Sequence, residues 1–98
     1  MTDALGQTIK VGDCVTHGLR QGNSGGHRLA IVYEITPANK LKVAYPATDF
    51  RGKLTGNAPT TTTIYLHNGV VLDIDRLEEG NEILRELKQI REEVLRDV

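Results

Sequence analysis

The spacing of hydrophobic residues changes once along this chain, close to residue 75. Before that point apolar side chains alternate with polar or small ones, which is the period of two that a β-strand requires. Residues 29–35 and 41–45 show this alternation, and residues 60–66 and 70–74 show it again. A further strand is expected over residues 13–17. The pattern therefore predicts a domain of several short strands.

Turn-forming residues separate these strands. Asn68-Gly69 is typical of a two-residue hairpin turn, because both central positions of that turn need φ > 0. We therefore expect residues 60–66 and 70–74 to pair as a hairpin. The glycine-rich residues 18–27 and the proline-containing residues 46–59 are expected to be loops.

The period becomes helical from about Asn81, which is a good N-cap residue. Apolar residues then recur at spacings of 4, 3 and 4 and form a stripe along one side of a helix. The stripe either packs against the strands of the same chain or meets a second copy or another protein. The predicted partner or oligomer interface consists of Ile83, Leu84, Leu87, Ile90 and Val94.

Length and composition fit one globular domain. The 98 residues are 39% hydrophobic and 26% charged, close to the globular average. We expect a mainly β fold, a small five-stranded SH3-like barrel over residues 1–75, followed by an amphipathic helix over residues 76–98. With one cysteine, no signal-peptide pattern and no long apolar run, the sequence predicts a cytoplasmic protein with no membrane contact.

Charge is distributed unevenly between the two regions. Residues 1–72 carry seven Lys/Arg and four Asp/Glu, whereas residues 73–98 carry five and nine. A basic surface near the predicted loops is typical of contact with a polyanion. The candidate nucleic-acid-binding residues are Arg20, His27, Arg28, Lys40, Lys42, Phe50, Arg51 and Lys53.

Two short motifs suggest chemistry that the rest of the chain does not support. Residues 22–26, Gly-Asn-Ser-Gly-Gly, resemble the segment around the nucleophilic serine of trypsin-like proteases, but the upstream His and Asp of those enzymes are missing. Cys14 and His17 make half of a zinc-ligand pattern, with no second pair. We therefore predict no catalytic residues, no metal and no cofactor, and we expect Cys14 to be a small core residue.

Residues 3–15 have the form D-x-x-G-x-x-I-x-x-G-D-x-V. This opening resembles the first strands of Src-homology-type small barrels, including KOW-like and Tudor-like modules, and the opening of YopX-type phage proteins. With the Gly/Ser/Arg segment of residues 20–26, the wider layout is similar to small actinobacterial-phage proteins of unknown function. The resemblance implies that Gly6 and Gly12 form turns and that Ile9 and Val15 point inward.

Such barrels bind peptides or nucleic acids. The resemblance therefore implies a non-enzymatic, phage-encoded binding or adaptor protein that acts in the host cytoplasm. Its helix would mediate homo-oligomerisation or docking to a protein partner, with no small-molecule substrate. The alternative is a nucleic-acid-binding barrel that uses the basic residues.

Overall fold

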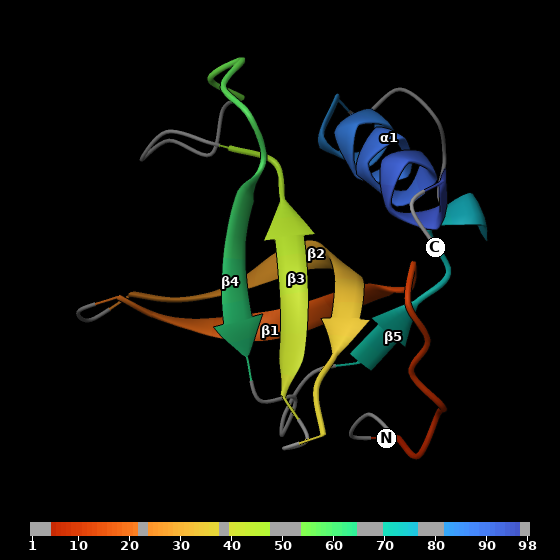
Figure 1. Cartoon of the computed structure of the whole chain (residues 1–98). Helices are drawn as coiled ribbons and strands as arrows, with labels where there is room; N and C mark the ends of the chain where they lie inside the picture. The colour runs from red at the N-terminus through yellow and green to blue at the C-terminus, as the bar shows by residue number, and fades with distance from the viewer. Residues whose placement is uncertain are drawn as a thin grey trace.

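Five antiparallel strands and one α-helix make up the computed structural model (Figure 1), which describes residues 5–21, 24–37, 40–47, 54–64, 70–76 and 82–96. The elements follow one another as β1 (Cys14–Gln21), β2 (Ser24–Ile35), β3 (Leu41–Tyr45), β4 (Thr60–Ile64), β5 (Val70–Leu72), the 3-10 turn η1 (Ile74–Arg76) and α1 (Glu82–Arg96). The mainly β fold with a C-terminal helix is thereby confirmed.

The strands form one sheet in the order β4-β3-β2-β1-β5. The long strand β2 bends, so that its first part pairs with β1 and its last part with β3 (Figure 1). Within the described part of the chain β4 and β5 are the two edges of the sheet and do not pair with each other. The sheet is unclosed, and the predicted barrel is not confirmed.

Two predictions about connections are wrong. The strands on either side of Asn68-Gly69 do not form a hairpin, because β4 pairs with β3 and β5 pairs with β1. A turn signal is local and does not determine which strand its neighbours join. The glycine-rich segment is not a loop either, since the β1–β2 ladder continues to the pair Gln21–Ser24. In this ladder Gly18, Gly25 and Gly26 stand opposite larger residues, as Gly25 does opposite Arg20.

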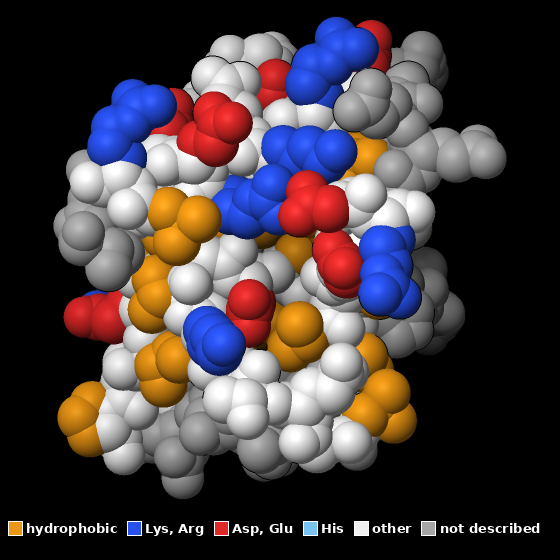
Figure 2. All heavy atoms as spheres, turned by 90° about the vertical axis from the view of Figure 1, so that its right-hand side faces the viewer, with side chains coloured by type: hydrophobic (Ala, Val, Ile, Leu, Met, Phe, Trp, Pro, Cys, Tyr) orange, Lys and Arg blue, Asp and Glu red, His pale blue; other side chains and the backbone are white. Residues whose placement is uncertain are grey.

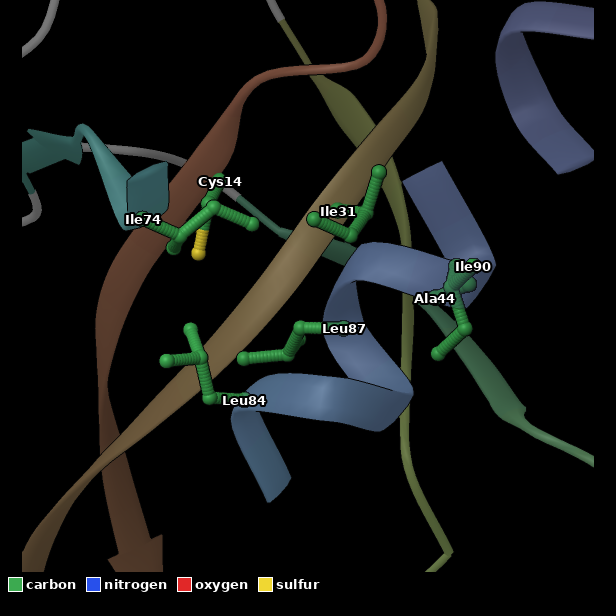
Figure 3. Close-up of a cluster of buried hydrophobic side chains, with 7 residues drawn as sticks. All are labelled: Cys14, Ile31, Ala44, Ile74, Leu84, Leu87 and Ile90. Atoms are coloured by element: carbon green, nitrogen blue, oxygen red, sulfur yellow. The ribbon is translucent and has the colours of Figure 1, made fainter. Parts of the chain in front are cut away.

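The helix packs against one face of the sheet. Leu84 and Leu87 point toward Cys14 and Ile31 of the first two strands, and Ile90 lies against Ala44 of β3 (Figure 3). Leu87 and Ile31 are both 0% exposed. The apolar stripe that the sequence predicted is therefore satisfied within the chain, and the helix is held by burial of its own side chains.

A second cluster covers the opposite face of the sheet. It contains Ile9 and buried residues of three strands, with partly buried residues of both edge strands against it. The full set is Ile9, Val15, Ala30, Val32, Leu41 and Val43, contacted by Ile35, Tyr45, Ile64 and Val71. Ile9 and Val15 are thus inward-facing, as expected. Because both faces of the sheet are buried, consecutive residues of β2 are apolar: Ile31 faces the helix, and Ala30 and Val32 face the second cluster.

A bulge in β2 determines where Tyr33 lies. Val32 pairs with Val43 and Glu34 pairs with Lys42, so that Tyr33 is an extra residue without a partner in β3. The extra residue shifts the alternation by one position. As a result Ile35 packs into the same cluster as Val32, three residues earlier, whereas Tyr33 remains 37% exposed.

Candidate functional site

A groove lies between the C-terminal half of α1 and the face formed by β2, β3 and β4. Its volume is about 330 Å³, comparable to a small ligand pocket. The described residues that line it are Tyr33, Ala44, Pro59, Thr61, Ile90, Glu93 and Val94. Each side of the groove comes from a different element, and the packing of α1 on the sheet brings them together.

The lining is mainly apolar. Ala44 forms part of the floor, since it is buried in the cluster beneath the helix, and Ile90 and Val94 supply the helical side. Glu93 is the charged residue among the described lining residues, and it is exposed. An apolar hollow with one carboxylate at its rim suits an apolar side chain that has a cation near it.

The edge strand β4 borders this groove. Thr61 lines the groove and pairs with Ala44 across the β3–β4 ladder. Residues Thr60, Thr61 and Thr63 are exposed, and the strand contains no charge and no proline. In the described part of the chain no strand pairs with the outer side of β4, which leaves a row of backbone N–H and C=O groups for another strand.

The predicted helix interface is only partly accessible in this arrangement. Leu84, Leu87 and Ile90 are covered by the chain's own sheet, and Ile83 and Val94 pack at the edge of the same cluster. A partner that used the whole stripe would have to displace α1. Val94 and Ile90, however, also line the groove, so that the accessible part of the stripe lies there.

The structure describes the side chains of only two residues of the predicted basic surface, Lys40 and Lys42. Lys42 forms an ion pair with Glu34, with 2.8 Å between Nζ and Oε2, and this hydrogen bond raises the pKa of Lys42. Lys40 is half-buried beside Thr36. Arg20, His27 and Arg28 lie on the paired strands β1 and β2, and Phe50, Arg51 and Lys53 lie outside the described residues. On the face that carries the helix, basic and acidic side chains are interspersed (Figure 2).

A second, more polar hollow of about 330 Å³ lies between β5, η1 and the end of α1. Arg91 lines it and donates two hydrogen bonds of 3.0 Å to the carboxylate of Asp75. The same hydrogen bonds lower the pKa of Asp75 and raise that of Arg91. Because the two charged groups bond to each other, this ion pair links α1 to η1.

The described residues contain no group of three His, Cys, Asp or Glu that could hold a metal ion.

Most residues of the groove were not identified from the sequence. Tyr33 is exposed because of a bulge that no local pattern signals, and Glu93 is one of many acidic residues on the helix. The available signal was Pro59 followed by four threonines, because a β-branched run without charges predicts an unprotected strand.

Comparisons with protein-family models, with curated proteins and with solved structures gave no match to this chain. None of the helices in the described residues has the length and apolar character needed to cross a membrane.

Proposed function

We propose that this chain is a non-enzymatic binding module, an adaptor, that holds a segment of a protein partner in the groove between α1 and the sheet. The observation that carries the proposal is an apolar groove of about 330 Å³ placed beside an exposed sheet edge. One way to recognise a protein segment combines a pocket for a side chain with backbone groups that can pair, and the two are adjacent here.

The small-barrel interpretation supports the same function. The strand order, the bend in β2 and one apolar cluster that reaches both edge strands are the features of a sheet that curls around its core. In such a fold the core and α1 give the groove a rigid frame. A phage origin, inferred from residues 3–35, remains part of this proposal.

Selection from a library of random heptapeptides displayed on phage tests the proposal. We expect the full chain to enrich peptides that bind it with micromolar Kd by calorimetry. The substitution Thr61→Trp fills the groove and should abolish that binding. Thr63→Trp is the matched control, because Thr63 is exposed on the same strand two residues away and does not line the groove. Equal binding by both variants would refute the groove as the site.

Nucleic-acid binding is the alternative function. The ion pair of Lys42 with Glu34 weighs against it, because a neutralised lysine releases fewer counterions from a phosphate backbone. Fluorescence anisotropy of labelled DNA and RNA across a range of salt concentrations tests this alternative. Micromolar binding that weakens steeply with salt, and that Thr61→Trp leaves unchanged, would place the function on the basic residues instead.

A further inference from the structure

The two sheet edges differ in how well they are protected against pairing. Natural proteins shield edge strands by making them very short or by placing charges, prolines or bulges in them. The edge strand β5 has three residues and is of the short kind. The edge strand β4 has five residues, Thr-Thr-Thr-Thr-Ile, and its ladder with β3 runs without a register shift. An edge without any of these devices is suited to accept another strand.

The geometry points to strand addition at β4 as the binding mode: a short extended segment of a partner protein pairs with the outer side of β4. This segment carries an apolar residue and a basic residue two positions apart. This inference rests on the proposed function and specifies its ligand. The added segment would run antiparallel to β4 and exchange backbone hydrogen bonds with it.

The side-chain pattern of the segment follows from the register. Thr61 stands opposite Ala44, and Ala44 belongs to the cluster beneath α1, so this position faces the helix. A residue of the added strand opposite Thr61 would point to the same side and reach the groove. Because side chains two positions apart share a face of a strand, a basic residue two positions from the one opposite Thr61 would lie on the same side of the sheet as Glu93.

A second copy of this chain fits the edge less well than a foreign segment. The strand and the groove together offer about eleven residues, whereas a stable interface uses about 20–30 residues on each side. A copy that paired through its own β4 would also bring only threonine and isoleucine, and therefore no cation for Glu93. A single peptide strand fits the small area of the edge and groove, and it can supply a cation for Glu93.

Charge reversal in the heptapeptide selection tests the basic residue. We expect peptides enriched on the full chain to share an apolar residue and a Lys or Arg two positions from it. On Glu93→Lys the enriched charge should change to Asp or Glu while the apolar residue is kept. The control Glu92→Lys alters the neighbouring exposed helical residue, which does not line the groove, and should leave the preference basic.

Backbone N-methylation of one enriched peptide tests strand addition itself. Methylation removes an N–H donor, so that at alternate positions the Kd should rise about tenfold, with little change at the positions between them. Uniform tolerance of N-methylation, with binding still lost in Thr61→Trp, would refute strand addition but keep the groove as a peptide site. Failure to enrich any peptide over Thr61→Trp would refute both. Light scattering that shows a dimer disrupted by Thr61→Trp would identify a second copy as the occupant and overturn the inference.

Discussion

At the scale of single residues, Gly12 lies in the turn before β1, next to the side chain of Leu95 in α1. Its N–H donates to the carbonyl of Val32, and the next residue, Asp13, accepts a hydrogen bond from the N–H of Lys10. Gly12 has φ +94°, and a Cβ at this position would lie 2.7 Å from Cδ2 of Leu95. The positive φ therefore favours glycine, whereas the methyl group of an alanine would only require the exposed end of the Leu95 side chain to move aside.

Replacing Gly12 with alanine should destabilise the protein more than the same change at Gly6. Both glycines have positive φ, which disfavours alanine by about 1–2 kcal/mol, but nothing lies within 4 Å of a Cβ at Gly6. Because the exposed end of the Leu95 side chain can move, we expect Gly12→Ala to lower the free energy of unfolding by less than about 1 kcal/mol more than Gly6→Ala in urea titrations. In a Leu95→Ala background this difference should disappear. If the difference between the two variants persists in the Leu95→Ala background, the backbone conformation and not the contact with Leu95 would be its cause.

Burial of Cys14 makes stability depend on alkaline pH. The side chain is 2% exposed, and desolvation raises the pKa of the thiol from 9.0 to about 12. Above pH 9 the unfolded chain releases the thiol proton while the folded chain keeps it, so that stability falls as pH rises. From pH 7 to pH 10 this linkage should lower the free energy of unfolding by about 1.4 kcal/mol.

The variant Cys14→Ala separates this effect from other groups that titrate in the same range. It should be less stable than the natural chain at pH 7, because the smaller side chain leaves a gap, yet its loss between pH 7 and pH 10 should be smaller. Urea titrations at the two pH values measure both changes. Equal losses in the two proteins would mean that the thiol ionises in the folded state.

At the scale of elements, α1 is stabilised by the sheet of the same chain. Leu87 is 0% exposed in the cluster with Ile31 and Cys14, whereas Leu95 on the same helix is 51% exposed. We expect Leu87→Ala to lower the free energy of unfolding by about 2–5 kcal/mol and Leu95→Ala by less than about 1 kcal/mol. Urea titration at two protein concentrations gives the measurement. A midpoint that depends on concentration, and loses that dependence in Leu87→Ala, would show that the stripe faces a second copy.

Strands and helices with a strong local hydrophobic period could be predicted from the sequence, but which strands pair with each other could not. The alternation in residues 29–35 predicted the C-terminal part of β2, and the stripe from Ile83 to Val94 predicted α1. Local pattern did not reveal that β4 and β5 lie at opposite edges, because pairing is decided by contacts between distant segments such as Cys14 and Leu72. The groove was missed for the same reason, since its walls come from four separate parts of the chain.

At the scale of the whole molecule, the sheet is a layer with apolar residues on both faces. One face is covered by α1, and the other encloses the cluster around Val15 and Val43. The sequence predicted a barrel over residues 1–75 followed by a helix, and it left open whether the helix packs against the strands of the same chain. The structure places Cys14, Ile31 and Ala44 directly beneath the helix, so that removal of α1 would expose a continuous apolar surface.

A chain that ends at Arg76 should therefore fail to fold as a stable monomer. We expect it to lose the cooperative urea transition and the dispersed amide spectrum of the full chain, because a small domain has little stability to spare. A synthetic peptide of residues 77–98, added in excess, should restore both by covering the exposed face. The same peptide with Leu87→Ala should restore them much less well. A cooperative transition in the shortened chain alone would instead establish residues 1–76 as an independent domain, with α1 as an appended element free to serve another partner.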